Sequence, residues 1–490
     1  MTRIRSEQYI LETLKPTYDF TKSNYFPYMM EINLGHLLML NKQNILGEDE
    51  AKLLLKKTYE LYQKGYTKEY DSSYEDLFFM IEADLEEELG GELVGNMHIA
   101  FSRNDMDTTM FRMFWRDCLL NWMNQVMELE EVILRLVDEH IMTIMPAHTH
   151  NQQAQPTTLS HYLMAVEQNL SRDLKRAMSL YDRINESPMG ACALSTTGFC
   201  IDRKYMCQVL GFDQVMANSY DAVATSDYLM EMASVLSISL SNLSRFVFDL
   251  IFMTTNEVNT LRLHDKHVQT SSIMPQKRNP SALEHTRASI SKALADLQGC
   301  FKVAHNVPFG DIVDIGDDIQ PPLLRGVQQS TSIIKILTEI LADCSFNSEL
   351  MIERVKGGFS TVTELSDTLV RNEEIPFRKA HGIVAHMVHE LNQQGQNMSG
   401  GSVERLKEIA REKYDCILQI TNTDFRKALN PTEFIRVRNI EGGPEMNEVK
   451  RQKQVSFTRL HQHKNWVSEK LNHIQASKQY LQQEVELFIQ

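Results

Sequence analysis

Glycine and proline are scarce in this sequence, with 21 and 13 among 490 residues. Stretches that alternate polar and apolar residues, the pattern of half-buried strands, are also hard to find. Both absences disfavour a protein built from β-sheets, because the many tight turns of such folds rely on these two residue types. We therefore expect helices to dominate.

Long apolar runs are missing as well. None approaches the roughly 20 residues that a membrane-spanning helix needs, and the first residues, MTRIRSEQYILETLKP, mix charge with apolar side chains, unlike a signal peptide. We expect a soluble, cytoplasmic protein with no membrane partner. The seven cysteines are scattered and form no CxxC pair, which favours reduced thiols over disulfides or thiol-bound metal.

Positive charge is in deficit, since the formal net charge is −15. This disfavours a nucleic-acid partner, because binding to phosphates needs clustered Lys and Arg. A glycine-rich phosphate loop and a dinucleotide fingerprint are absent, and histidine pairs such as His148 and His150 lack the Cys or carboxylate spacing of a metal site. We expect no cofactor and no metal. The net charge is compatible with a small anionic substrate, because a few local cations can dominate a pocket.

Helical periodicity is the strongest pattern present. Apolar residues recur at steps of three and four along 154–183, 228–252 and 281–303, which predicts three long amphipathic helices. Their broad apolar faces favour a bundle in which helices are buried on more than one side, and partner chains are one way to cover the second side. We predict an N-terminal helical domain at 1–110, a central helical bundle at 111–360 and a C-terminal helical domain at 361–490.

The segment with the most chemistry is TSSIMPQKRNP, from Thr270 to Pro280. It places hydroxyls, an amide and two cations between helix breakers, which is the composition of a mobile loop that closes over an anion. On composition alone, a basic surface loop explains it equally well. The order of its residues resembles the GSSxMPxKxNP signature of the fumarase/aspartase superfamily, with Thr270 in place of the glycine.

Other segments resemble argininosuccinate lyases in the same order along the chain. They include SRND at 102–105, THNQQAQP at 149–156, PMGACAL at 188–194 and PFRKAH at 376–381, and the likeness covers roughly residues 25 to 395. The resemblance implies an all-α, fumarase/aspartase-like subunit, with a long central helical bundle flanked by two smaller helical domains. It also implies a homotetramer in which segments of three subunits build each active site.

The activity implied by the resemblance is that of a carbon–nitrogen lyase, which eliminates an amine from an N-substituted aspartate and releases fumarate, or adds it in reverse. A base must remove a weakly acidic proton beside a carboxylate, and an acid must protonate the departing nitrogen. The resemblance makes Ser271 the base, with Lys277 and oriented dipoles drawing away its proton. It makes His150 the acid, paired with Glu284.

Other residues of the matched segments are candidates for binding the succinyl carboxylates through charge-assisted hydrogen bonds. Arg103 is the main cation among them, although pairing with a neighbouring acid is a simpler explanation for this residue. The full set of predicted binding residues is Ser102, Arg103, Asn104, Thr149, Gln155, Asn279 and Asn33.

One stretch departs from the family pattern. The family has a segment like STYNKDLQED whose Tyr and Gln bind the arginine half, and an ungapped alignment places Asp311 and Gly316 at those two sites. Asn33 also replaces a family serine, and Phe78 replaces the His of an EDxH segment. This pattern favours a related lyase with another amine, such as the ethylenediamine-disuccinate lyases.

Two alternatives remain at this point. The first is a genuine argininosuccinate lyase with a diverged pocket. The second is a non-catalytic structural relative of the kind found among lens crystallins, which the presence of Ser271, Lys277, His150 and Glu284 disfavours.

Overall fold

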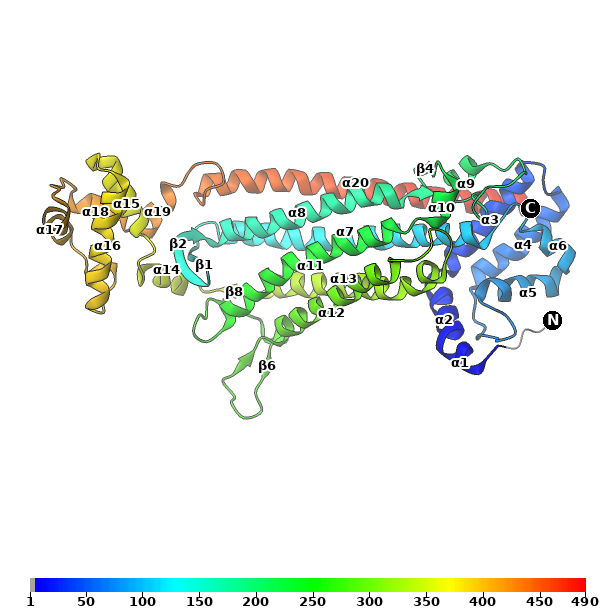
Figure 1. Cartoon of the computed structure of the whole chain (residues 1–490), viewed down its shortest axis with the longest axis horizontal. Coiled ribbons are helices and arrows are strands. Elements are labelled where there is room, and N and C mark those ends of the chain that lie inside the picture. Colours follow the sequence, from blue (N-terminus) through cyan, green and yellow to red (C-terminus); the bar gives the residue numbers. More distant parts are fainter. Residues whose placement is uncertain (1–4) are drawn as a thin grey trace.

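The computed structural model describes residues 5–490, and helices form most of it, as predicted (Figure 1). One end of the elongated molecule contains α1 (Glu7–Tyr9), α2 (Lys15–Asn24), α3 (Phe26–Lys42), α4 (Glu48–Lys64), α5 (Leu77–Leu89) and α6 (Gly91–Asn96). The limits of α4 follow from its sequence. Three acidic residues occupy its first turn, where they stabilise the positive end of the helix dipole, and Gly65 ends it with a φ of 75°.

Five long helices form the central bundle and lie side by side along the molecule (Figure 1). They are α7 (Arg103–Glu139), α8 (Leu159–Ile184), α11 (Asp227–Thr254), α12 (Ser281–Ala304) and α13 (Gln320–Asp343). The helices predicted at 228–252 and 281–303 are therefore confirmed. Between α8 and α11 lie β3 (Glu186–Ser187), α9 (Arg203–Val209), β4 (Gln214–Val215) and α10 (Ser219–Ala224).

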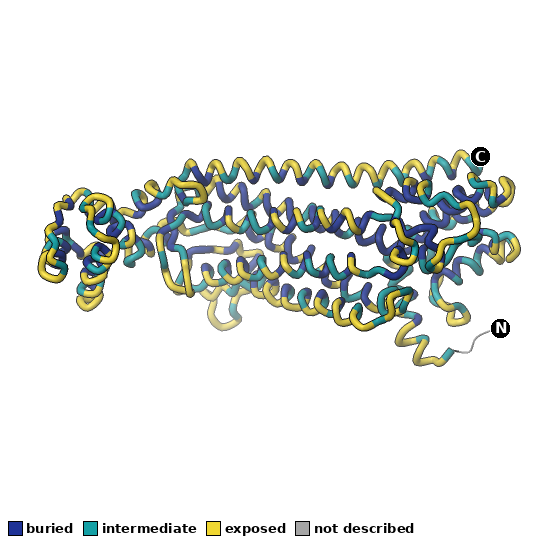
Figure 2. The backbone as a smooth tube through the Cα atoms, turned by 45° about the horizontal axis from the view of Figure 1, so that its top comes forward, coloured by how far each residue is buried: buried dark blue, intermediate teal, exposed yellow. Residues whose placement is uncertain are grey.

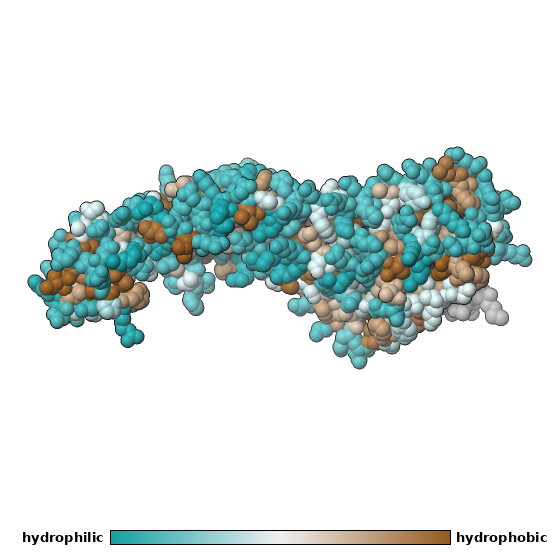
Figure 3. All heavy atoms as spheres, turned by 90° about the horizontal axis from the view of Figure 1, so that it is seen from above, coloured by the Kyte–Doolittle hydropathy of each residue, from teal (hydrophilic) through white to brown (hydrophobic). Residues whose placement is uncertain are grey.

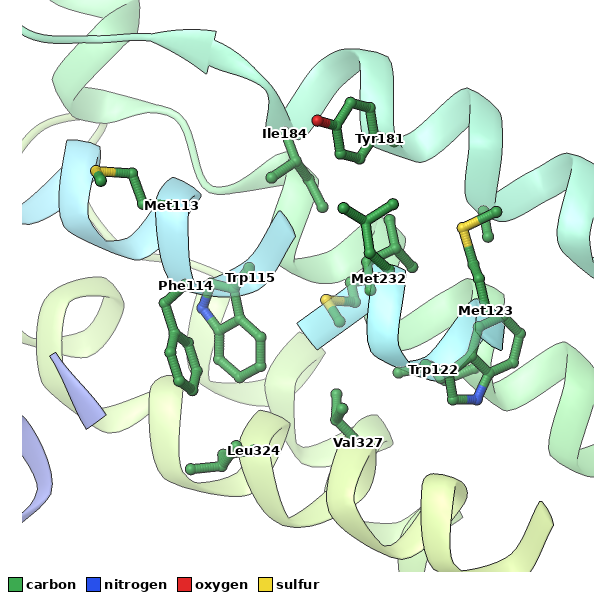
Figure 4. Packing of buried hydrophobic residues seen from close by; sticks show 14 of the residues in the cluster. Met113, Phe114, Trp115, Trp122, Met123, Tyr181, Ile184, Met232, Leu324 and Val327 are labelled. Atoms are coloured by element: carbon green, nitrogen blue, oxygen red, sulfur yellow. The ribbon is translucent and has the colours of Figure 1, made fainter. Parts of the chain in front are cut away.

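Two tryptophans of α7 anchor the core of the bundle (Figure 4). Both are fully buried, and both satisfy their indole N–H. Trp115 donates to Oε1 of Gln320 at 2.8 Å, and Trp122 donates to Oγ of Ser330 at 2.9 Å. Because both acceptors lie on α13, these bonds favour one register between α7 and α13.

The predicted helix at 154–183 begins five residues later than expected, at Leu159. Residues 144–158 instead form an antiparallel hairpin of β1 (Ile144–Thr149) and β2 (Gln152–Thr158). Pro156 has no N–H to donate within a helix. Thr158 then caps α8, because its hydroxyl accepts the backbone N–H of His161 at 3.2 Å.

The C-terminal part forms a smaller body with its own core at the opposite end of the molecule (Figure 1). It contains α15 (Val362–Glu373), α16 (Phe377–Gln393), α17 (Val403–Tyr414) and α18 (Asn422–Ala428). The flanking helices α14 (Ser348–Lys356) and α19 (Pro431–Arg436) pack against the β1–β2 hairpin. The last helix, α20 (Met446–Ile489), leaves this body and returns along α7 and α8. Residues 446–489 therefore pack on the bundle.

Among the helices of residues 5–490, α11 is the one that is long and apolar enough to span a bilayer, by length and composition only. It nevertheless packs against α8, α12 and α13, as a core helix does. Its uncovered side retains exposed apolar residues, namely Ile238, Phe248 and Phe252. Buried residues run along the whole bundle in Figure 2, and hydrophilic atoms cover most of the face in Figure 3.

Candidate active site

The predicted site residues lie in three separate groups within one chain. The first group is at the start of α7 and the second is in the hairpin that follows α7. With a rise of 1.5 Å per residue, this helix of 37 residues is about 55 Å long. Arg103 and His150 therefore cannot contact one small substrate within a single chain.

The third group lies around a short hairpin that projects from the bundle (Figures 1 and 2). The hairpin pairs β6 (Gln269–Thr270) with β7 (Arg278–Asn279). Ser271 and Lys277 lie in its connecting loop, Asn279 lies in β7, and Glu284 lies in the first turn of α12. The loop is exposed, and Ile273 at its tip retains 86% of its accessible surface. The predicted base is thus carried on a segment that is free to reach another surface.

The Ser271 hydroxyl lies against the backbone of its own loop. Its Oγ accepts the N–H groups of Ile273 at 3.3 Å and Met274 at 3.0 Å. Donors aimed at an oxygen favour its negatively charged form. The loop therefore contains the kind of oriented dipoles that a serine base requires.

His150 lies at the tip of the β1–β2 hairpin. His150 and Asn151 form its two-residue turn, with φ of 51° and 58°. Positive φ at both positions is the type I′ pattern, which matches the twist of paired strands. Thr149 and His150 are exposed there. The turn thus presents the imidazole at the end of a short, defined support.

Gln155 lies further along the same hairpin, next to the C-terminal body. Its Nε2 donates to Oγ1 of Thr363 at 3.2 Å. Both residues line a cavity of about 530 Å³ between the hairpin, α15 and α16, which Phe377 and His381 of the PFRKAH segment also line. The structure therefore brings two of the matched segments together at this cavity.

Ser102 and Asn104 have structural roles at the start of α7. Ser102 caps α7 by accepting the N–H of Asn104 at 3.3 Å, while the Asp105 carboxylate accepts the N–H of Ser102 at 3.0 Å. This is a capping box. Asn104 Nδ2 donates to the carbonyl of Ala193 at 3.4 Å. Asn33 lies buried in α3, and its Oδ1 has no hydrogen-bond partner within residues 5–490.

Arg103 pairs with an acidic neighbour, as the simpler explanation expected. Its Nη2 lies 2.6 Å from Oδ2 of Asp76. The guanidinium also lies near the rings of Phe78 and Phe79, 5.8 and 5.4 Å from their centroids. This pairing does not exclude substrate binding, because the guanidinium has further N–H groups.

Several more carboxyl groups surround Arg103. Burial raises the pKa of Asp107 to about 8, with Arg103 opposing the shift and Asp76 and Asp317 adding to it. Desolvation, followed by the charge of Asp318, raises the pKa of Asp317 to about 6. Desolvation also raises the pKa of Asp311, against the effect of Arg103. Burial thus disfavours the charged form of these carboxyl groups, and a cationic group bound beside them would favour that form.

Sequence reasoning identified Asp311 but missed Asp107 and Asp317. Asp107 lies four residues after Arg103, so both share a face of α7. This spacing of four residues was the sequence signal from which Asp107 could have been predicted to lie near Arg103. Asp317 lies in a turn of π-helix, Asp314–Asp318, which has no clear sequence pattern. Within the described residues, no group of three or more His, Cys, Asp or Glu side chains is placed to hold a metal ion.

Comparisons with known proteins match most of the chain. A family model described as "Lyase" matches residues 21–294, and one described as "Argininosuccinate lyase C-terminal" matches residues 359–436. The argininosuccinate lyase of Methanocaldococcus jannaschii is 35% identical over 450 residues, which is 92% of this chain and 91% of that protein.

Solved structures agree with these matches. A variant of EDDS lyase with bound fumarate is 30% identical, with a TM-score of 0.89 over 100% of this chain and 97% of that one. A class II fumarase from Schistosoma mansoni is 16% identical, with a TM-score of 0.67 over 84% of this chain and 90% of that one, and shares the fold.

Proposed function

The chain belongs to the argininosuccinate lyase family of fumarate-releasing carbon–nitrogen lyases, and we propose that its substrate is argininosuccinate, which it splits into arginine and fumarate. The observation that carries this proposal is the 35% identity to an argininosuccinate lyase over 92% of the chain. The different amine, predicted from Asp311 and Gly316 at the positions of the family's Tyr and Gln, has weaker support. The cytoplasmic location and the absence of a cofactor stay predictions.

The acidic groups near Arg103 support a cationic amine half. Asp311 stands where the family has a neutral tyrosine, and Asp317 and Asp107 add two more carboxyl groups. A guanidinium binds carboxylates through charge-assisted and often bidentate hydrogen bonds. Replacing a neutral contact by an acidic one therefore retains affinity for arginine, although it changes the geometry of recognition.

The elimination itself is assigned to residues of the two hairpins and of the first turn of α12. Ser271 removes the proton beside the carboxylate, helped by the amides that already donate to its oxygen. Lys277 and Asn279 stabilise the charge that develops on that carboxylate. His150 protonates the departing nitrogen, and Glu284 orients its ring. Because these groups are separated within one chain, we propose a homotetramer in which neighbouring subunits complete each site.

A second candidate substrate is ethylenediamine disuccinate. The likeness to EDDS lyase over the whole chain, with a TM-score of 0.89, favours it. A diamine is also cationic, so the acidic groups alone do not distinguish it from arginine.

Both substrates should be compared on one preparation of the enzyme by following fumarate absorbance. We expect kcat/KM for argininosuccinate to exceed that for ethylenediamine disuccinate by at least about tenfold, a margin of roughly 1.4 kcal/mol. The opposite ranking would favour the second candidate, and no fumarate from either substrate would contradict both.

A substitution tests whether an acidic side chain binds the amine half of the substrate. Asp311→Asn should lower kcat/KM for argininosuccinate by about tenfold, because one charge-assisted contact is lost. Asp314→Asn, in the same stretch, is the matched control and should change kcat/KM by less than about twofold. Equal effects of the two substitutions would count against a contact with Asp311.

A further inference from the structure

Arg103 occupies an unusual position for a surface arginine. It is the first residue of α7, its side chain is 36% exposed, and its guanidinium lies near the rings of Phe78 and Phe79 at the start of α5. Favourable contact between a cation and an aromatic ring restrains the guanidinium on that side. Its Nε is buried without a hydrogen-bond partner among residues 5–490. The side chain is thus packed on one side and open on the other.

Asp76 connects this arginine to the scaffold. One carboxylate oxygen, Oδ1, accepts the N–H of Phe79 at 3.2 Å and caps α5. The other, Oδ2, lies 2.6 Å from Nη2 of Arg103, and only 16% of the side chain is exposed. A single carboxylate therefore connects the first turn of α5 to the side chain at the first turn of α7.

We infer that Asp76 is a positioning residue for substrate binding, which holds the Arg103 guanidinium so that its remaining N–H groups face a carboxylate of the substrate. An arginine has five N–H groups in a rigid plane, so an ion pair on one side leaves donors on the other. Fixing the side chain beforehand removes the entropy cost of ordering it when the substrate binds. The inference rests on the proposed role of Arg103 in binding a carboxylate, whichever amine the enzyme releases.

The substitution Asp76→Asn separates positioning from folding. Asparagine has nearly the same shape and caps helices as well as aspartate, so α5 keeps its cap while Arg103 loses the charge of its partner. Glu75→Gln is the matched control. It removes one negative charge at the adjacent, exposed residue, whose carboxylate lies 3.8 Å from Arg5.

The kcat, the KM, the inhibition constant for fumarate and the thermal midpoint should be measured on the full chain in its natural assembly. For Asp76→Asn we expect KM and the fumarate inhibition constant to rise by at least about tenfold, with kcat changed by less than about threefold, because a contact made equally in the ground and transition states affects KM alone. Glu75→Gln should leave all of them within about twofold. In an Arg103→Ala background, Asp76→Asn should add little, since the two residues act as one unit.

Four results would overturn the inference. A lower thermal midpoint with an unchanged fumarate constant would assign Asp76 to capping alone. Tighter fumarate binding in Asp76→Asn would mean that Asp76 competes with the substrate for Arg103. If Asp76→Asn had equal effects in the Arg103→Ala and wild-type backgrounds, Asp76 would act through another group. Normal binding of fumarate by Arg103→Ala would show that Arg103 does not bind a carboxylate of the substrate. The proposed function, the release of fumarate from the substrate, would still stand.

Discussion

At the scale of single residues, Ser271 carries the most direct prediction. Ser271→Ala should lower turnover by at least about a hundredfold, because a general base typically contributes that much or more. The fold should survive, since the residue lies in a projecting loop. Steady-state turnover and the thermal midpoint measure the two effects. Ser272→Ala, at the next and more exposed position, is the control, and near-normal turnover of Ser271→Ala would exclude it as the base.

The residues of the matched motifs could be named from sequence because their order is distinctive. Ser271, Lys277 and Asn279 lie in one short segment, the β6–β7 hairpin, that the sequence delimits on both sides. Their surroundings were less predictable. The ion pair of Asp76 with Arg103 joins residues 27 positions apart, and the grouping of Asp107 with Asp317 joins residues more than 200 positions apart. Such contacts depend on how helices pack, and helix periodicity does not specify this.

At the scale of elements, a buried carboxyl group lies between α7, α8 and α20. Glu130 of α7 is 1% exposed, and neither of its carboxyl oxygens has a hydrogen-bond partner within the described residues. Burial raises the pKa of Glu130 well above its usual range. The charge of Glu167 adds to the shift, Arg459 opposes it and Asp173 adds to it. Between its unfolded and folded pKa values, Glu130 therefore holds a proton in the folded chain that the unfolded chain has released.

This shift predicts that stability falls with rising pH. Because the folded pKa is above the unfolded one, Glu130 lowers the free energy of unfolding by about 1.4 kcal/mol per pH unit between the two values. Glu130→Gln removes the titrating group, so its thermal midpoint should exceed that of the wild type by a margin that grows as the pH rises above the usual pKa of a glutamate. Glu128→Gln, exposed on the same helix, should follow the wild type. Parallel curves for Glu130→Gln and the wild type would contradict the assignment.

Among the elements, the long helices α11 and α12 were predicted from the sequence and the β1–β2 hairpin was not. Amphipathic periodicity repeats over many turns in α11 and α12, so a few exceptions do not obscure it. The hairpin has short strands, and its turn contains His150 and Asn151 in place of the Asn-Gly pair that usually indicates a type I′ turn. The element that presents the predicted acid is therefore the one with the weakest sequence signal.

At the scale of the whole molecule, α11 is expected to be an assembly surface. Phe248 and Ile238 are exposed apolar residues of α11. The rest of the single chain covers this helix on one side. We predict a particle of about four chains of 56.6 kDa each by sedimentation. Phe248→Glu should shift the particle toward smaller species, because a charge is costly in a buried interface. The activity of the enzyme should fall as the assembly dissociates. A fully active single chain would contradict the assembly.

The central claim is that separate chains complete one active site, and mixing two inactive variants tests it most directly. Ser271→Ala and His150→Asn should each be nearly inactive alone. If every site takes Ser271 and His150 from different chains, a random one-to-one mixture obtained by coexpression contains both wild-type residues in about a quarter of its sites. We predict recovery of up to about a quarter of wild-type turnover. Mixed assemblies that form but stay as inactive as the two parents would contradict the claim.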